Sequence, residues 1–464
     1  MASDFKGCQR LVISKQQILW LEEILSLYVA PDLEIKREGD DYYCIVLKDS
    51  DERVFCQIIP ELWEVGEAKF GCVRWSPESE GYQSILEEDI PAPGLNKAPD
   101  LMIETIQNGV RVNYDILGLT YWMLTRAEEV GRTDLDNHSR FPSTSSHGHQ
   151  NDYLETPVVD VWLEMLRQVS QQLWPSLSFI EHSFNFIVTH DVDRPSYYGF
   201  TYKSAFLSLV RDVLAKKSFF KACKRFFVSL GIRDHLTPID PYSRMIGWLM
   251  DQSEQKGNKS IFYFLAGGNH IRYDADYDLG HPAIRKLMKE MHQRGHQLGL
   301  HPSYNTYNNP FRLKKESEYF KRICEEEGII QEQPCGRMHY LRWQTPRTAR
   351  LLADAGIKYD SSLSYADRSG FRCGTCREYP MFDPVEKDKI GLLESPLIVM
   401  ENSILNEKYM DLGYGDAAFE KFMKLKNTCE KLGGNFVLLW HNSSFPTSDH
   451  QDLYVRVLSE MHRK

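Results

Sequence analysis

From about residue 184 to residue 440, short apolar segments typical of buried strands alternate with amphipathic segments typical of helices. Repeated strand–helix units of this length imply parallel strands joined by right-handed crossovers. This alternation predicts an α/β fold with a barrel-like arrangement for this part of the chain. The predicted strands cover residues 184–194, 261–268, 296–301, 336–341, 357–360 and 436–440, and the predicted helices cover 281–294, 315–327, 346–355 and 416–432.

Residues 1–150 follow a different pattern, which predicts a smaller α+β N-terminal domain of unknown function before a second domain at 151–464. A helical period over 16–30 is followed by alternating, strand-like segments over 41–59 and at 71–75, and by a second helical segment at 117–130. The stretch 134–152 is polar and rich in Gly and Ser, which predicts a loop in which His147 and His149 are solvated.

Composition excludes several classes of protein. A net charge of −10 and a pI near 5.9 argue against nucleic acid as the main partner. No run approaches the roughly 18 apolar residues that span a bilayer, and the first residues lack a secretory pattern, so we expect a cytoplasmic protein. Ten scattered cysteines fit free thiols. The basic, aromatic-rich stretch 204–230 favours a packed helix pair with a solvated basic side; contact with a membrane surface or an anionic substrate is the alternative.

Polar side chains lie at or near the ends of four of the predicted strands: Asp191 and Asp193, then His301, then Arg337 with His339 and Arg342, then His441 with Asn442. Because parallel α/β sheets place their chemistry at the carboxyl ends of strands, we expect these side chains to share one site. An Asp and a His can hold a divalent metal, a second carboxylate supported by Arg can accept a proton from water, and a second His can protonate a leaving amine. The pattern predicts hydrolysis of an amide or ester.

The order of these motifs resembles the polysaccharide deacetylase family with the NodB-homology fold. Thr189-His-Asp-Val-Asp193 resembles a variant of its aspartate motif, His301-Pro-Ser-Tyr-Asn305 its histidine motif, Arg337 its third motif and Leu439-Trp-His441 its fifth, over roughly residues 180–445. The resemblance implies a distorted (β/α)7-type barrel. It also implies Asp191 as base, Arg337 as its support, His441 as acid, and a metal, zinc in most of the family, on Asp193, His301 and Asn305.

Two positions depart from the family pattern. Val192 separates the two aspartates, so spacing does not fix which is base and which is ligand; we assign Asp191 as base and Asp193 as ligand. Asn305 stands where the family has a second histidine. A neutral amide is a poor zinc ligand, so four alternatives stay open at this point: a weaker site, a site that relies on both aspartates, a harder oxygen-preferring metal, or a site without metal.

Other residues near these motifs are candidates for substrate binding: His190, Ser303, Tyr340, Trp343, Tyr365 and Phe371. The last four could form a sugar-stacking wall, although core packing also explains such aromatic residues. Cys373-Gly-Thr-Cys376 lacks a second pair, so we expect it to line the substrate cleft rather than bind zinc. Residues 117–162, with His138-Ser-Arg-Phe141, resemble an uncharacterised domain that often precedes this branch of deacetylases.

The function implied is removal of an acetyl group from an N-acetylated (or O-acetylated) sugar or glycan precursor, with a carbohydrate as partner. Two alternatives remain. A catalytically degenerate module that binds glycan or a partner would hold no stoichiometric metal, and Asn305 is its main support. A C–N hydrolase acting on a non-sugar amide would be recognised by its products. The sequence does not predict an oligomeric state.

Overall fold

The computed structural model describes residues 12–197, 199, 200, 236, 240–268, 270 and 272–460. The basic stretch predicted as a helix pair at 204–230 lies outside these residues.

The main element is a nine-stranded sheet with the strand order β13-β14-β12-β11-β10-β9-β8-β16-β15. Every neighbouring pair is parallel except β13 with β14, so the predicted α/β class and parallel pairing are confirmed. Its strands are β8 (Asn185–Val192), β9 (Ile261–Leu265), β10 (Gln297–His301), β11 (Cys335–Gly336), β12 (Tyr359–Asp360), β13 (Tyr379–Asp383), β14 (Asp388–Glu394), β15 (Val399–Met400) and β16 (Asn435–Leu439).

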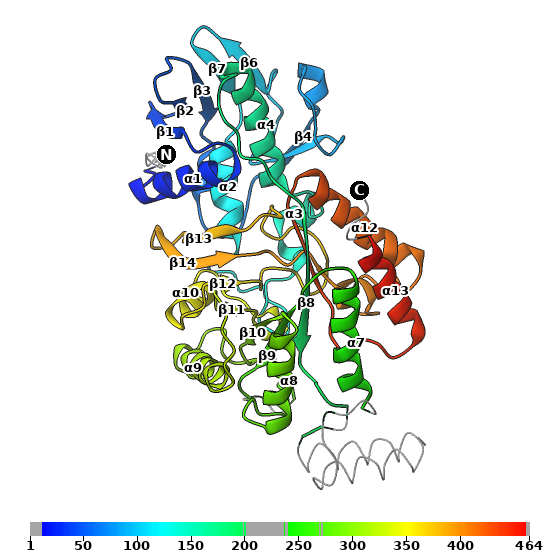
Figure 1. Ribbon diagram of the computed structural model, residues 1–464. Coiled ribbons are helices and arrows are strands. Elements are labelled where there is room, and N and C mark those ends of the chain that lie inside the picture. The colour runs from blue at the N-terminus through cyan, green and yellow to red at the C-terminus, as the bar shows by residue number, and fades with distance from the viewer. Residues whose placement is uncertain are drawn as a thin grey trace, which may run out of the picture.

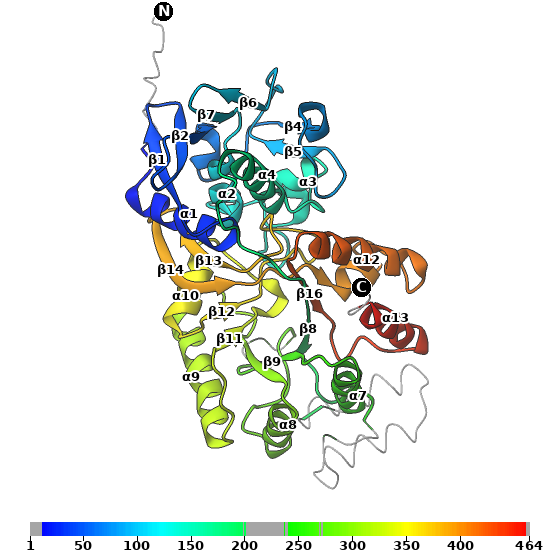
Figure 2. The ribbon, with the colours of Figure 1, turned by 45° about the horizontal axis from the view of Figure 1, so that its top comes forward.

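Helices lie around the outside of this sheet (Figures 1 and 2). The central strands β8, β9, β10 and β16 are buried over most of their length, as expected for strands covered on both faces. The helices begin after polar or proline signals; Asp240, for example, accepts backbone N–H bonds at the start of α7. They are α7 (Pro241–Gln255), α8 (Pro282–Gln293), α9 (Pro310–Glu326), α10 (Arg347–Asp354), α11 (Glu401–Leu405), α12 (Asp416–Lys431) and α13 (Ser448–Ser459).

The predicted barrel stays a prediction. Among the described strands no closed ring of hydrogen bonds is detected, and β13 and β15 stand at the two ends of the order. The strand predicted at 336–341 stops at Gly336, and the chain then forms a single 3-10 turn at His339–Leu341. The hairpin of β13 and β14 was not predicted, because its strands carry few of the β-branched residues that mark a strand in sequence.

The first part of the chain forms a second sheet, with the order β1-β2-β3-β7-β6, and a separate β4-β5 ribbon. In Figure 1 these elements gather on one side of the large sheet, next to β13 and β14. The division at residue 150 stays a prediction, since one hydrophobic core runs from Trp20 through Trp122 to Phe262 and Leu392. The elements are α1 (Lys15–Tyr28), β1 (Leu33–Glu38), β2 (Tyr42–Leu47), β3 (Arg53–Gln57), β4 (Cys72–Trp75), β5 (Ile90–Pro93), β6 (Ile103–Ile106), β7 (Gly109–Val112), α2 (Ile116–Leu124), α3 (His147–Gln150) and α4 (Val158–Leu173).

Buried ion pairs join the first part of the chain to the large sheet. The Glu129 carboxylate accepts hydrogen bonds from Arg126 at 2.9 Å and from two nitrogens of Arg372 at 2.9 and 2.8 Å. All three side chains are at most 3% exposed. Burial alone would raise the pKa of Glu129, but Arg372 and Arg126 lower it to about 2. A charged network of this kind requires the two parts of the chain to keep one relative position.

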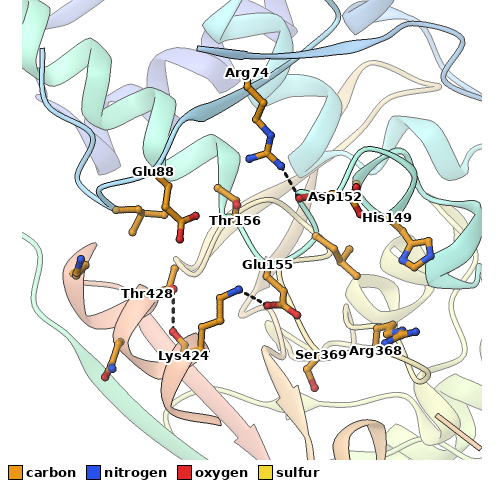
Figure 3. A pocket seen from close by; sticks show the side chains of 15 residues that line it. Arg74, Glu88, His149, Asp152, Glu155, Thr156, Arg368, Ser369, Lys424 and Thr428 are labelled. Atoms are coloured by element: carbon orange, nitrogen blue, oxygen red, sulfur yellow. Dashed lines mark hydrogen bonds and ion pairs between the residues drawn. The ribbon is translucent and has the colours of Figure 1, made fainter. Parts of the chain in front are cut away.

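A polar cavity of about 600 Å³ also lies between the two parts, beside α12 (Figure 3). In it Arg74 donates to the Asp152 carbonyl at 2.7 Å, and Lys424 pairs with Glu155 at 2.8 Å. His149 lines the cavity as well. None of the candidate catalytic or metal-binding residues lies in its lining, so this cavity is separate from the site described below.

Two sequence predictions near this boundary were wrong. His147 is not solvated: it is 3% exposed, and its ring nitrogens lie 2.7 Å from the Tyr153 hydroxyl and 3.0 Å from the Phe70 carbonyl. The Cys373–Cys376 turn does not line a substrate cleft, because both cysteines are buried. The turn packs on the start of α4, where Asp160 accepts from the Cys376 N–H at 2.8 Å. Among the described residues, no helix is both long enough and apolar enough to cross a membrane.

Candidate metal centre and hydrolytic site

The predicted polar residues meet at the carboxyl ends of neighbouring strands. Asp191 and Asp193 belong to the end of β8, His301 is the last residue of β10, Arg337 follows β11, and His441 follows β16. Since β16, β8, β9, β10 and β11 are consecutive in the sheet, their ends form one polar surface. The alternation of side chains along β8 places Thr189, Asp191 and Asp193 on the same side of the strand.

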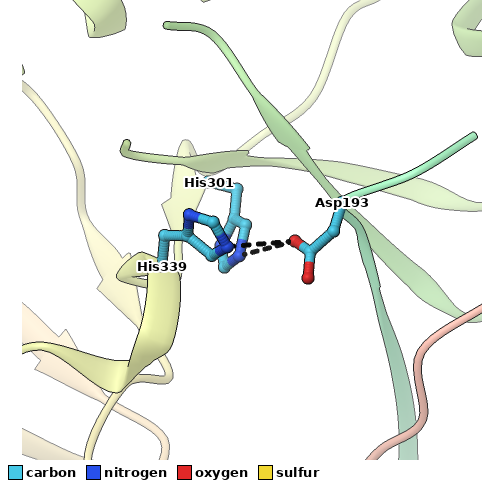
Figure 4. A group of neighbouring side chains, drawn as sticks. All are labelled: Asp193, His301 and His339. Atoms are coloured by element: carbon cyan, nitrogen blue, oxygen red, sulfur yellow. Dashed lines mark ion pairs between the residues drawn. The ribbon is translucent and has the colours of Figure 1, made fainter. Parts of the chain in front are cut away.

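Asp193, His301 and His339 form a group that could hold a metal ion (Figure 4). Their ligand atoms all lie within 4.8 Å of one another. Asp193 Oδ1 is 3.3 Å from His301 Nε2 and 3.5 Å from His339 Nε2. Two imidazoles and one carboxylate are the donor types that zinc binds in catalytic sites, where the remaining positions serve water and substrate.

The outer contacts of the two histidines direct their Nε2 atoms toward Asp193. His301 Nδ1 lies 2.5 Å from the Arg337 carbonyl, and His339 Nδ1 lies 3.2 Å from Asp274 Oδ1, so each Nδ1 carries the proton. Two buried atoms of the group, His301 Nε2 and Asp193 Oδ1, make ion-pair contacts within the group but no hydrogen bond to any residue that the structure describes. Buried polar atoms without partners are rare in proteins, and a metal ion would satisfy both. The residues therefore fit a divalent metal.

Charge coupling within the group is strong. Burial raises the pKa of Asp193, but His339, His301 and His441 outweigh it and hold that pKa well below its usual range. Burial lowers the pKa of His339, while the Asp193 and Asp274 carboxylates raise it, to about 9 overall. Because a histidine binds metal only as the neutral imidazole, metal binding must release this proton.

Asp191 is held beside the metal group by a buried arginine. Arg337 NH1 lies 3.3 Å from Asp191 Oδ1 and 2.6 Å from the Thr189 hydroxyl. Its Nε and NH2 donate to the carbonyl and the hydroxyl of Ser361 at 2.8 and 2.9 Å, and its guanidinium lies 4.6 Å from the centre of the Tyr263 ring. A fully buried guanidinium with these contacts is fixed in place, and it holds the Asp191 carboxyl group in one position.

His441 faces both aspartates from the other side. Its Nε2 is 3.9 Å from Asp191 Oδ2 and 3.7 Å from Asp193 Oδ2. Its Nδ1 lies 2.7 Å from the buried carboxylate of Glu401, the first residue of α11. Burial lowers the pKa of His441, but Glu401 and then the two aspartates raise it to about 10. The imidazolium is therefore the stable form in this structure, as a general acid requires.

The third side chain of the metal group is His339, which the sequence motifs did not single out as a ligand. Asn305, the ligand that the sequence motif implies, stays a prediction; its side-chain oxygen lies 3.5 Å from Arg342 Nη1. His339 reaches the group because the chain turns sharply after β11, where Tyr340 and Leu341 have left-handed backbone angles of φ 61° and 52°. The nearest sequence signal was its position two residues after Arg337.

His190 and Ser303 do not face the site. His190 alternates with Asp191 along β8, so its ring points to the opposite side, where its Nδ1 lies 2.7 Å from the Trp440 carbonyl and its exposure is 0%. Ser303 is also fully buried, and its hydroxyl donates to Glu316 at 2.5 Å. Neither side chain is accessible to a substrate in this structure, contrary to the expected binding role.

Of the four aromatic residues expected in a stacking wall, Tyr340 alone is placed next to the metal group. Its ring centre lies 4.7 Å from that of His339. Trp343, Tyr365 and Phe371 are only 2–3% exposed. The Tyr365 hydroxyl lies 3.3 Å from Arg126 in the buried ion-pair network, and Phe371 belongs to a hydrophobic core. Core packing accounts for these three residues.

A buried pair of carboxyl groups, Asp360 and Glu394, lies behind the site as register partners on β12 and β14. Asp360 accepts from the Ser362 hydroxyl at 2.9 Å, and that hydroxyl accepts from the Met338 N–H at 2.8 Å, so the pair supports the backbone that carries Arg337 and His339. Burial raises the pKa of Asp360 to about 6. Burial and the Asp360 charge raise the pKa of Glu394 well above its usual value.

This pair predicts a pH-dependent stability. A carboxyl whose folded-state pKa is raised stabilises the fold fully below its unfolded pKa, about 4, and the contribution is lost as pH rises through about 6. We therefore expect Glu394→Gln, which leaves one carboxyl beside a neutral amide, to gain stability relative to wild type between pH 5 and pH 8. Urea unfolding at several pH values measures this difference. Glu386→Gln, which changes an exposed carboxylate, is the control. If the free energy of unfolding depends on pH in the same way in wild type and in Glu394→Gln, the buried pair is not the cause of the pH dependence.

This chain shows only weak similarity to known proteins. Residues 64–175 match a family of unknown function, DUF7033. No curated protein matches the chain significantly.

Among solved structures, a protein from Mycobacterium smegmatis described as a polysaccharide deacetylase is 14% identical with a TM-score of 0.39, over 61% of this chain and 86% of that chain. The PuuE allantoinase is 12% identical with a TM-score of 0.35, over 60% and 83%. A mutant of a CE4 family pseudoenzyme with restored enzymatic activity is 9% identical with a TM-score of 0.30, over 64% and 79%. Likenesses this weak carry no argument about the site.

Proposed function

We propose that this protein is a metal-dependent hydrolase that removes the acetyl group from an N-acetylated (or O-acetylated) sugar or glycan precursor. The observation that carries the proposal is the convergence of three sets of side chains at one sheet edge. The Asp193, His301 and His339 group lies between an Asp191–Arg337 pair and a His441–Glu401 pair. The sugar as substrate rests on the likeness of the sequence motifs to those of polysaccharide deacetylases.

A divalent metal on this group, with zinc as the first candidate for its two nitrogen ligands and one oxygen ligand, would supply Lewis-acid polarisation of the acetyl carbonyl and of water. The other residues divide the proton transfers. Asp191, held in place by Arg337, accepts the proton of the attacking water. His441, kept protonated by Glu401, donates a proton to the leaving nitrogen. His441 Nε2 lies 3.9 Å from Asp191 Oδ2, so the base and the acid reach the same part of the site.

The experiment that tests this proposal compares two variants that separate the structure from the sequence motif. His339→Ala removes a member of the metal group, whereas Asn305→Ala removes the residue that the motif places there. We expect the wild type to hold about one equivalent of metal after mild dialysis. We expect His339→Ala to contain no metal and to release no acetate from N-acetylglucosamine oligomers. We expect Asn305→Ala to keep the metal. Elemental analysis and an acetate assay measure both.

The outcomes separate the alternative functions. A wild type that stays free of metal after incubation with zinc, cobalt or manganese would refute the hydrolase and favour the binding module. Loss of metal from Asn305→Ala but not from His339→Ala would mean that Asn305, and not His339, is the third metal ligand. A wild type that binds metal and hydrolyses small non-sugar amides, but releases no acetate from N- or O-acetylated sugars, would favour the C–N hydrolase.

A further inference from the structure

A turn from the first part of the chain, residues 136–140, reaches the metal site from outside the large sheet. Arg140 NH1 donates to the Tyr340 carbonyl at 3.0 Å. In the other direction, Arg342 donates from Nε to the His138 carbonyl at 2.7 Å and from NH1 to the Tyr304 carbonyl at 2.5 Å. The turn belongs to the 64–175 segment, whose family has no known function, and no role in the proposed hydrolysis has been given to it above.

The 136–140 turn is rigid by its own hydrogen bonds. The Asp136 carboxylate accepts from the His138 N–H at 2.8 Å, from the Arg140 N–H at 2.9 Å and from Arg140 Nε at 2.8 Å. Ser139 at its tip has a left-handed backbone with φ 59°. Because the Asp136 carboxylate binds the backbone before and after Ser139, the turn is fixed and holds the His138 side chain in one place.

His138 joins a cluster of aromatic side chains that extends to the metal ligands. Its ring centre lies 4.9 Å from that of Tyr340 and 5.2 Å from that of Tyr273, and its Nδ1 lies 3.0 Å from the Tyr304 hydroxyl. Tyr340 in turn lies against the metal-group residue His339 at 4.7 Å. His138, Tyr273 and Tyr340 are only partly buried, unlike the aromatic residues of the core. The cluster is thus an accessible aromatic surface next to the candidate metal.

Tyr340 is placed there at a conformational cost. A left-handed backbone is unfavourable for a residue with a Cβ atom, and both Tyr340 and Leu341 adopt it. Such residues persist where the surroundings hold them, and here Arg140 of the 136–140 turn binds the Tyr340 carbonyl. The first part of the chain therefore both presents His138 and holds Tyr340 over the site.

We propose that His138 of the 136–140 turn, together with Tyr273 and Tyr340, binds the pyranose ring of the acetylated sugar, so that the 64–175 segment supplies part of the substrate site. This assignment rests on the proposed deacetylase function and names how that function selects its substrate. The C–H face of a pyranose ring is apolar and packs on aromatic rings, while its hydroxyl groups hydrogen-bond to tyrosine and imidazole at the edge. Burial and then Arg140 lower the pKa of His138, so its imidazole is neutral at pH 7, as stacking on an uncharged sugar favours.

The test is the steady-state kinetics of His138→Ala with two probes, N-acetylchitotetraose and the small ester 4-nitrophenyl acetate. We expect KM for the tetrasaccharide to rise roughly tenfold, the size of one lost aromatic contact. We expect kcat for the tetrasaccharide, and both constants for the small ester, to stay within about twofold of wild type, since the variant leaves the metal, base and acid groups intact. His138→Phe keeps an aromatic ring and should restore most of the affinity for the tetrasaccharide.

His149→Ala is the matched control: this histidine belongs to the same 64–175 segment but lines the separate cavity of Figure 3, so no change is expected. The backbone carbonyl that Arg342 binds is present in both His138 variants, and circular dichroism of each confirms the fold. Unchanged tetrasaccharide kinetics in His138→Ala, with an active wild type, would overturn this assignment and leave the deacetylase function standing. A wild type that deacetylates no N-acetylated sugar would refute the function and this assignment together.

Discussion

Replacing Asp191 by asparagine is expected to lower kcat for acetate release by roughly 10²–10⁴, the usual contribution of a general base. The amide has the shape of the carboxylate but cannot accept the proton of water. Asp191 is not part of the Asp193, His301 and His339 group, so the variant should keep its metal. The contact with Arg337 at 3.3 Å becomes a hydrogen bond from the charged guanidinium to a neutral amide oxygen, which leaves the geometry intact. Acetate release and metal content of the same preparation measure both effects.

The matched variant is Asp193→Asn, which should lose both metal and activity because Asp193 Oδ1 faces both ligand histidines. The pair resolves which aspartate is base and which is ligand, a question that Val192 between them leaves open in the sequence. The opposite pattern, with metal lost from Asp191→Asn and kept by Asp193→Asn, would reverse the two assignments. Asp251→Asn, at an exposed ion pair with Arg294, serves as a control for the substitution itself.

Replacing Glu129 by alanine is expected to destabilise the protein by roughly 3–5 kcal/mol, the usual cost of breaking a buried ion pair from one side. The loss leaves Arg372 buried without a carboxylate and removes one of the two acidic partners of Arg126. The Thr345 hydroxyl, 3.0 Å from the same carboxylate, loses its acceptor too. Chemical denaturation, with the midpoint and slope both fitted, measures the free energy of unfolding.

Glu155→Ala is the matched control, since Glu155 also joins the first part of the chain to the large sheet, through Lys421 and Lys424. These side chains are between 20% and 55% exposed. Exposed pairs contribute about 0–1 kcal/mol, so this variant should unfold within about 1 kcal/mol of wild type. Equal losses in the two variants would mean that burial of the Glu129 network contributes little to stability.

The α/β class and the positions of the central strands were predictable because both are local properties of the sequence. The apolar run of β8 and its polar end at Asp191 and Asp193 are visible along ten residues. The helices α8, α9, α10 and α12 follow from amphipathic spacing and end within a few residues of glycines. Parallel pairing then requires these strand ends to lie together, which is why Asp191, His301, Arg337 and His441 meet as expected.

The tertiary structure alone decided the remainder of the site. His339 reaches the metal group through two consecutive left-handed residues, and residue spacing gives no sign of such a turn. His190 points away from the site because side chains alternate along a strand. The sequence motif alone does not show which of the adjacent residues His190 and Asp191 faces the site.

The contact of His138 with Tyr304 and Tyr340 joins residues about 170 to 200 positions apart. Packing between the two parts of the chain, and no local pattern, creates that contact. The sequence was enough to predict which strands carry polar side chains at their ends. The folded chain was needed to show which of these side chains face the candidate metal group.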